Sequence, residues 1–161
     1  MVCTTIRRFA HAALLAGMLL LPVLMGTGHA AAAIPRPCEG TGCNGKDPIA
    51  MTCDQDAYIA EGGTFTNTNV LPNSMNVTYG LQLLYSPTCG TNWARAYIVD
   101  PPNSTFKISP ALVDATITTV LDVADVPNAS DAYGNMWYAP SQPVRACVYL
   151  NGKQGFCTAA G

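Results

Sequence analysis

Cysteine usage limits what this chain can fold into more than any other feature. The sequence holds seven cysteines: Cys3 lies near the N-terminus, ahead of Arg7, and six lie far beyond it, namely Cys38, Cys43, Cys53, Cys89, Cys147 and Cys157. An even number of cysteines in an exported chain is typical of a disulfide framework that stabilises a small fold. The number of cysteines alone does not choose among the ways in which six of them can pair.

The first residues have the three parts of a secretory signal peptide. Arg7 and Arg8 form a charged start, the apolar run FAHAALLAGMLLLPVLMG follows, and the small residues of TGHAAAA offer a cleavage site after Ala30 or Ala33. The apolar run is short for a membrane span and contains a proline. We therefore expect residues 1–33 to be a removable signal peptide.

Residues 34–161 would then form a single secreted β domain of about 128 residues, without a membrane anchor. All ten acidic residues but only six basic ones fall in this part, which gives it a net charge of −4. A weakly acidic domain lacks the basic surface that nucleic acids and anionic membranes require. We expect neither as a partner.

One disulfide can be argued from local geometry. The segment VRACVYLNGKQGFCTA has apolar runs on both sides of an Asn-Gly pair, which is a strong β-hairpin signal. A three-residue loop at 151–153 would place Leu150 opposite Gln154 and Cys147 opposite Cys157. Residues directly opposite in a hairpin are close enough for a disulfide.

For the other four cysteines we favour Cys38–Cys43 across a glycine-rich turn and Cys53–Cys89 holding the N-terminal loop to the core. The alternative is a metal site built on Cys38, Cys43 and Cys53. Their C-x4-C-x9-C spacing lacks the close cysteine pairs of common zinc modules, and export favours oxidation. We expect no metal and no cofactor.

Histidine is missing from residues 34–161, because His11 and His29 both precede them. The stretch YSPTCGTNWAR, residues 85–95, looks catalytic because Ser86 stands close to Cys89. Without histidine, a serine or cysteine nucleophile lacks its usual general base, and a disulfide-bonded cysteine is not a nucleophile. We expect a protein that is not an enzyme.

The remaining sequence is typical of short β-strands separated by turn signals. In MNVTYGLQLLYS, alternate residues from Val77 to Tyr85 share one apolar face, NWARAYIV is a second strand, and STFKIS ends before Pro110. LVDATITTVLDV, residues 112–123, alternates with period two and predicts one half-buried strand.

Residues 34–56 are rich in glycine and proline and predict an irregular N-terminal loop. Together with the strands and cysteines, they predict an all-β fold, a small disulfide-stabilised antiparallel barrel or sandwich.

Tyr85, Trp93, Arg95 and Tyr97 are the candidate binding residues. A guanidinium can stack on aromatic faces, and an exposed row of such side chains would make a binding surface. The alternative is ordinary core packing with one amphipathic arginine.

Four segments share their order and residues with a known pattern. They are CEGTGCNGKDPIAMTC at 38–53, DQDA at 54–57, LQLLYSPTCGTNWAR at 81–95, and RAC…CT at 145–158. In this order they resemble the actinobacterial secreted domain catalogued as domain of unknown function 2690. The resemblance implies an exported or surface-exposed domain with an oxidised framework, and it implies no activity.

These observations leave three functional hypotheses. The first is a non-catalytic module that binds a component at or outside the cell envelope. The second is an inhibitor of a secreted protease, which needs a protruding loop at 62–76 or 100–104. The third is a carboxylate-dependent hydrolase using Asp54, Asp56 and Glu61. The same carboxylates, together with Asp47, could instead offer oxygens to calcium.

Overall fold

The computed structural model describes residues 38–67, 76–101 and 106–161. The predicted signal peptide lies outside these residues, and so do the larger parts of the two segments considered for an inhibitory loop. Within the described residues, no helix has both the length and the apolar character to cross a bilayer.

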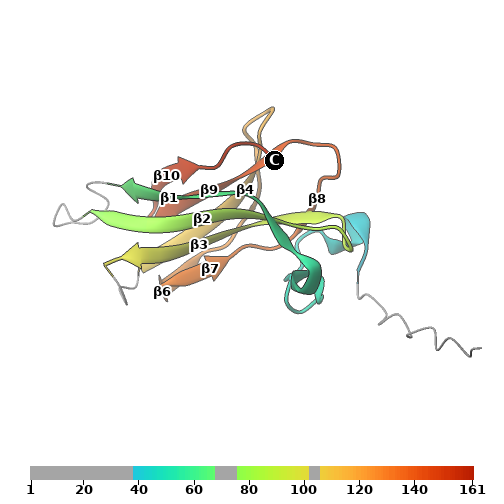
Figure 1. Cartoon of the computed structure of the whole chain (residues 1–161), viewed down its shortest axis with the longest axis horizontal. Coiled ribbons are helices and arrows are strands. Elements are labelled where there is room, and N and C mark those ends of the chain that lie inside the picture. Colours follow the sequence, from blue (N-terminus) through green and yellow to red (C-terminus); the bar gives the residue numbers. More distant parts are fainter. Residues whose placement is uncertain (1–37, 68–75, 102–105) are drawn as a thin grey trace, which may run out of the picture. The chain divides into compact units, whose positions relative to one another are not determined.

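The described chain contains ten β-strands and two single-turn 3-10 helices (Figure 1). The helices are η1 (Gly40–Cys43) and η2 (Cys53–Asp56). The strands are β1 (Tyr58–Asn67), β2 (Val77–Ser86), β3 (Thr91–Asp100), β4 (Phe106–Asp114), β5 (Val120–Val123), β6 (Val126–Ala129), β7 (Asp131–Tyr133), β8 (Trp137–Tyr138), β9 (Val144–Leu150) and β10 (Lys153–Cys157).

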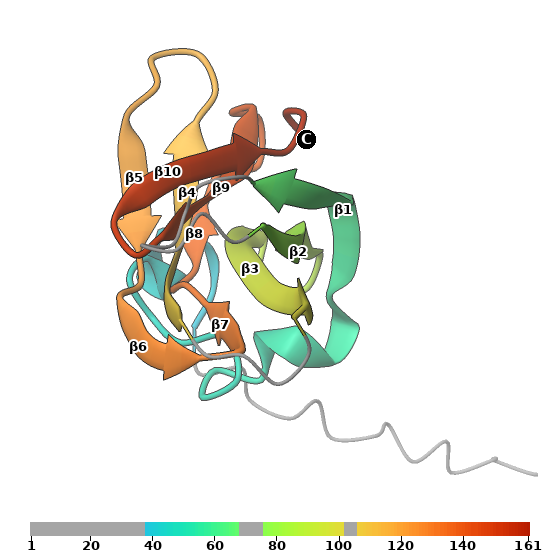
Figure 2. The ribbon, with the colours of Figure 1, turned by 90° about the vertical axis from the view of Figure 1, so that its left-hand side faces the viewer.

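The strands form two antiparallel sheets. One has the order β1-β2-β3-β7, with β8 also paired to β3, and the other has the order β10-β9-β4-β5, with β6 also paired to β4. Figure 2 shows the strands of the two sheets in two layers. The sheets are not closed into a barrel, so of the two predicted architectures the fold is the sandwich.

The core lies between the sheets and is built from alternate strand residues. On β2 the inward side chains are Val77, Tyr79, Leu81 and Leu83, all with no exposed surface. They pack with inward residues of the second sheet: Ile108, Leu112, Val144, Ala146, Val148 and Leu150. The period-two pattern therefore predicts the core face of β2, because alternate residues of a strand point to opposite sides.

The prediction of one strand over residues 112–123 is wrong. The chain turns after β4 and returns as β5, with Val113 paired to Val120. The Asp114 carboxylate makes the turn, because its Oδ1 accepts hydrogen bonds from the Thr116 N–H at 2.7 Å and the Thr116 hydroxyl at 2.6 Å. Such an aspartate turn needs neither glycine nor proline, so the alternating pattern continues through it.

Pro110 also does not end a strand. It lies within β4 opposite Val148 of β9. The Pro110 carbonyl still accepts a hydrogen bond, from the N–H of Ala124 at 3.1 Å. Proline lacks only the donor, so the strand continues on both sides of it.

The β9–β10 hairpin forms with a shorter loop than predicted. Lys153, not Gln154, pairs with Leu150, so the loop consists of Asn151 and Gly152. Both loop residues have positive φ, as a two-residue hairpin turn requires. A bulge between Gln154 and Cys157 then restores the predicted opposition of Cys147 and Cys157.

All three disulfides favoured from the sequence are present. They are Cys38–Cys43, Cys53–Cys89 and Cys147–Cys157. The first two lie at the end of the sandwich where the N-terminal segment contacts the β2–β3 turn, and the third joins β9 to β10.

The turn carboxylate makes stability depend on pH. The Thr116 hydroxyl, more than any other contact, holds the pKa of Asp114 below its usual value. A depressed pKa in the folded state adds stability above the unfolded pKa of about 4, and this stability disappears as pH falls through the folded value.

We expect Asp114→Asn to lower the urea midpoint at pH 7, and we expect this difference from wild type to shrink as pH falls below about 4 and the carboxyl is protonated. Urea unfolding at pH 7, 5 and 3, followed by tryptophan fluorescence, measures this. A gap between the two proteins that stays constant over this range would contradict the assignment.

Candidate functional site

The N-terminal segment, residues 38–57, lies against the outer face of the first sheet, which contains β1, β2, β3, β7 and β8. A covalent bond fixes its position. The Cys53–Cys89 disulfide joins η2 to the turn between β2 and β3. Backbone hydrogen bonds add to it: Gly45 N–H donates to the Met136 carbonyl at 2.9 Å, and Met136 N–H donates to the Lys46 carbonyl at 2.9 Å. Figure 1 shows this segment at the end of the sandwich where β2 and β3 meet.

A second, smaller apolar cluster fills the space under this segment. Its buried members are Cys38, Cys43, Cys53, Cys89, Trp93 and Met136. The sulfurs of Cys38, Cys43 and Cys53 lie within 4.8 Å of one another, which is close enough for a metal site. All three are bonded in disulfides, however, so they offer no free thiolate to a metal.

Ser86 has a structural partner. Its hydroxyl donates to Asp56 Oδ1 at 2.6 Å and accepts from the Cys89 N–H at 3.1 Å. Burial raises the pKa of Asp56, but the hydrogen bonds from Ser86 and Thr88 outweigh it and leave that pKa below its usual value. The part of the YSPTCGTNWAR stretch that looks catalytic is therefore the turn between β2 and β3. Hydrogen bonds to Asp56 and the Cys53–Cys89 disulfide hold this turn in place.

Beside this cluster, a pocket of about 560 Å³ opens on the outer face of the first sheet. This volume is within the range of small-molecule sites. Leu84 of β2 and Trp93 of β3 form its floor. The N-terminal segment forms one side with Pro48, Ile49, Asp54 and Ala57, and Arg95, Asp131 and Tyr133 form the other.

Negative charge surrounds Tyr133 at this pocket. Burial first, and then the nearby carboxylates, raises the pKa of the Tyr133 hydroxyl, which therefore remains a hydrogen-bond donor. These carboxylates belong to Asp47, Asp54 and Asp131. Asp47 is held by its own turn, since its Oδ1 accepts from the N–H groups of Ile49 at 2.8 Å and Ala50 at 3.1 Å.

Arg95 neutralises one of these carboxylates. Its Nε and Nη2 donate to the two oxygens of Asp131 at 3.0 and 2.5 Å, a two-pronged ion pair. Both side chains are more than 40 % exposed, so the pair adds little stability. The guanidinium also lies 5.5 Å from the centre of the Tyr97 ring.

Tyr97 has a packing role on the same face. A Cβ on Gly80, its partner across β2 and β3, would lie 2.1 Å from the Tyr97 ring. The ring therefore covers the glycine backbone, and a side chain at position 80 would displace it.

The four candidate binding residues do not form a single row. Trp93, Arg95 and Tyr97 share the outer face of β3, and Trp93 is only 3 % exposed at the pocket floor. Tyr85 pairs with Asn92 and lies on the other face, where it lines a separate hollow together with Tyr58.

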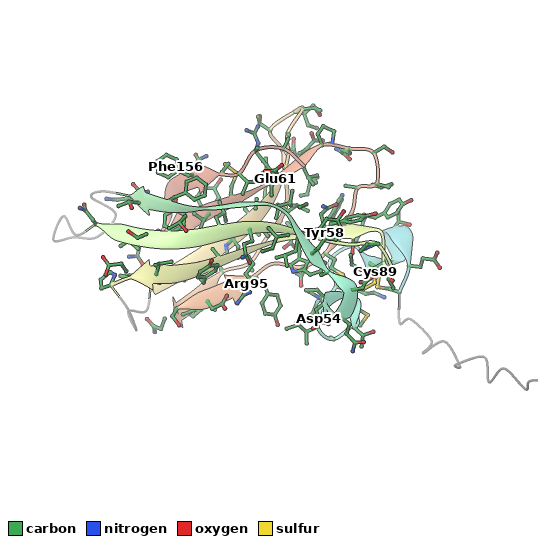
Figure 3. All side chains as sticks on the ribbon, viewed as in Figure 1. Asp54, Tyr58, Glu61, Cys89, Arg95 and Phe156 are labelled. Atoms are coloured by element: carbon green, nitrogen blue, oxygen red, sulfur yellow. A yellow bond between two sulfur atoms is a disulfide. The ribbon has the colours of Figure 1, made fainter. Side chains whose placement is uncertain are left out.

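The acidic residues considered for hydrolysis are dispersed. Asp54 lines the pocket, whereas Asp56 is bonded to Ser86 and Thr88. Glu61 is on β1 near the C-terminal Gly161, and Figure 3 shows Glu61 well apart from Asp54. The paired-carboxylate cleft that the hydrolase hypothesis requires does not form from these three residues.

Asp54 has a different place in the site. In the described part of the chain, its carboxylate has no hydrogen-bond or ion-pair partner. By contrast, Asp131 forms an ion pair with Arg95, and Asp47 accepts a hydrogen bond from the Ile49 N–H. Figure 3 shows Asp54 on the N-terminal segment and Arg95 on the neighbouring strand. The site thus combines an apolar and aromatic floor with one unpaired negative charge.

Sequence reasoning missed Leu84, Asp131 and Tyr133. The alternation of Asp131 and Tyr133 in SDAYGN is a weak strand signal, and β7 has only three residues. Leu84 falls on the outer side of a strand whose inner side carries the core. The pocket appears only when the N-terminal segment covers this outer side.

Comparison with known proteins gives a family but no activity. The sequence model of the family described as protein of unknown function (DUF2690) matches residues 41–147, which include every residue of the pocket. No curated protein and no solved structure matches the chain significantly. Because the family match covers about two thirds of the sequence, the chain belongs to the DUF2690 family, whose function is unknown.

Proposed function

We propose that this chain is a secreted, non-catalytic binding module whose pocket takes a cationic group carried on an apolar stem. The observation that carries the proposal is the unpaired Asp54 carboxylate beside the apolar floor of Leu84 and Trp93. A lysine-like side chain matches this arrangement, because its methylene stem can lie on apolar surface while its ammonium group meets the carboxylate.

The electrostatics of the pocket support a cationic ligand. The one guanidinium there, that of Arg95, is already bonded to Asp131. Burial raises the pKa of Tyr133 most, but the carboxylates of Asp47, Asp54 and Asp131 raise it further, and they make the potential there negative. An anionic ligand would meet the unpaired charge of Asp54 without a free cation to offset it.

Secretion and the absence of catalysis belong to the proposal. Three disulfides are typical of exported proteins, and they support a site outside the cytoplasm. Residues 34–161 lack histidine, and all six cysteines are bonded to one another. A component of the cell envelope that displays an amine, or the basic side chain of a secreted protein, has the chemistry that the pocket favours.

The test compares two probes that differ by one charge, N-acetyl-lysine methylamide and N-acetyl-norleucine methylamide. We expect the wild-type protein to bind the lysine probe more tightly, and Asp54→Asn to weaken that binding by about tenfold, because a hydrogen bond to a charged group is lost. Amide chemical shifts in an NMR titration give the dissociation constants and locate the bound probe.

The matched control is Glu39→Gln, which removes one negative charge at an exposed position away from the pocket. It should change the dissociation constant less than twofold. Equal affinity for the two probes, or an equal loss in Glu39→Gln, would reject the site. Turnover of either probe in the mass spectrum after incubation would reject the non-catalytic part of the proposal.

A further inference from the structure

The outer face of the second sheet carries a separate hollow of about 360 Å³. Its lining residues belong to β4, β5, β9, β10 and the turn between β4 and β5. Figure 2 shows these strands in the layer opposite the sheet that carries the pocket described above. Its lining side chains include Val113, Thr118, Val120, Arg145, Tyr149 and Gln154. The Cys147–Cys157 disulfide also borders the hollow and fixes β10 beside β9.

Arg145 reaches this hollow because of the strand period. Its neighbours Val144 and Ala146 have no exposed surface and belong to the core between the sheets. Arg145 therefore points to the outer side, next to Val113 of β4, with which it pairs. Arg145 lies on β9, a central strand of its sheet. The strand backbone is rigid and therefore holds the positive charge in a defined place, as a binding site requires.

The Arg145 guanidinium is poorly satisfied by the protein. Among the described residues, its Nε is the one buried side-chain nitrogen or oxygen atom without a hydrogen-bond partner. Its Nη2 has one long hydrogen bond, 3.5 Å to the Ala115 carbonyl. The ion pairs within the described chain join Arg95 to Asp131 and Lys107 to Asp125, so no carboxylate neutralises Arg145 there.

The chemistry of a suitable ligand follows from these groups. A guanidinium presents its N–H donors in a planar fork that matches the two oxygens of a carboxylate. A carboxylate here would supply the missing negative charge and acceptors for the terminal N–H groups of the guanidinium, which Nε, buried beneath them, supports from inside. The side chains of Val113 and Val120 would contact an apolar group attached to it, and the Tyr149 hydroxyl and Gln154 amide offer further donors.

We propose that this hollow is an anion-binding site that takes the carboxylate of a small organic molecule, with Arg145 as its main ligand. The site is independent of the cation pocket, because the two share no lining residue and lie on different sheets. The Arg145 charge binds the carboxylate, and the two valines select an apolar substituent over a bare ion.

The experiment uses N-acetyl-leucine, its uncharged amide and inorganic phosphate as probes. The side-chain Nε–H signal of Arg145, identified by its absence in Arg145→Lys, reports on the state of the guanidinium in a nitrogen–proton NMR spectrum. We expect N-acetyl-leucine to shift this signal and the amide to leave it unchanged. We expect Arg145→Met, which keeps an apolar stem, to weaken binding of N-acetyl-leucine at least tenfold.

Two further variants keep the test decisive if Arg145→Met folds poorly. Arg145→Lys keeps the charge but loses Nε and the fork, and it should bind several times more weakly than wild type. Lys107→Met removes the same charge from the same sheet outside the hollow and should change binding less than twofold. An unmoved Arg145 signal, tighter binding of phosphate than of N-acetyl-leucine, or an equal loss in Lys107→Met would overturn the assignment.

Discussion

Removing the Cys53–Cys89 disulfide by the double substitution Cys53→Ala/Cys89→Ala is expected to destabilise the protein by about 4 kcal/mol. The bond closes a loop across a sequence separation of 36 residues, the longest of the three. Its removal therefore gives the unfolded chain the most conformational freedom. Alanine keeps both buried positions apolar, so the loss reflects mainly the missing cross-link.

The structure also predicts where the effect appears. Without the bond, the N-terminal segment loses its covalent tie to the β2–β3 turn, and Trp93 beneath it becomes more accessible to water. We expect a drop in melting temperature of roughly 15 °C and a red shift of tryptophan emission. Calorimetry and fluorescence measure these two quantities.

The other two disulfides are the matched controls, since each can be removed in the same way, by replacing both of its cysteines with alanine. Their sequence separations are 10 for Cys147–Cys157 and 5 for Cys38–Cys43. The loop-length argument gives about 3 and about 2 kcal/mol respectively. A different order of the three losses would show that native contacts, not loop closure, dominate their effect.

Local chemistry explains which parts of the fold could be predicted from the sequence. The strand alternation around Leu81, the Asn-Gly hairpin and the Cys147–Cys157 pair all depend on residues near one another in sequence, and their geometry follows from strand period and turn type. The family resemblance adds the order of the cysteines. These features predict the all-β fold class. They do not distinguish a sandwich from a barrel, because strand order depends on pairing between residues far apart in sequence.

The turn at Asp114 shows why the β4–β5 boundary was missed. Its residues are polar and β-branched, and the pattern has no glycine or proline to interrupt it. What makes the turn is the hydrogen bond from Thr116 to the Asp114 carboxylate, which competes with strand extension. Residue type alone does not distinguish this aspartate from one on the exposed face of a strand.

The candidate pocket could be predicted only in part for a similar reason. Trp93 and Arg95 stand out in the sequence as an aromatic and a cationic residue on one strand face. The charge of Asp54 also stands out in the sequence, but its neighbours there suggest a grouping with Asp56 and Glu61. Its role at the pocket depends on where the Cys53–Cys89 disulfide places the N-terminal segment, and this is a tertiary feature.

Tyr79 carries the second large prediction, because it connects the two sheets. It is completely buried on the inner face of β2, and its hydroxyl accepts a hydrogen bond from the Phe156 N–H of β10 at 2.8 Å. The bulge between Gln154 and Cys157 takes Phe156 out of regular pairing with β9. The Tyr79 hydroxyl supplies the acceptor that the strand partner does not.

We expect Tyr79→Ala to cost about 3 to 5 kcal/mol, since it removes a buried ring and leaves a cavity. Tyr79→Phe keeps the ring and should cost about 1 to 3 kcal/mol, because the Phe156 N–H loses its acceptor. Urea unfolding of the three proteins measures both steps. A phenylalanine variant as stable as wild type would show that the hydroxyl contact does not contribute.

Gly155 tests the same contact from the opposite strand. A Cβ at this position would lie 2.6 Å from the Tyr79 hydroxyl and 2.9 Å from Cγ1 of Val148, so Gly155→Ala should cost about 1 to 3 kcal/mol by overpacking. Removing the hydroxyl relieves the closer of these clashes. The double variant Tyr79→Phe/Gly155→Ala should therefore lose less stability than the two single losses together, by about 0.5 kcal/mol or more. Additive losses would mean that β10 shifts away from β2 when either residue changes, and that the tyrosine hydroxyl does not set the spacing between the two sheets.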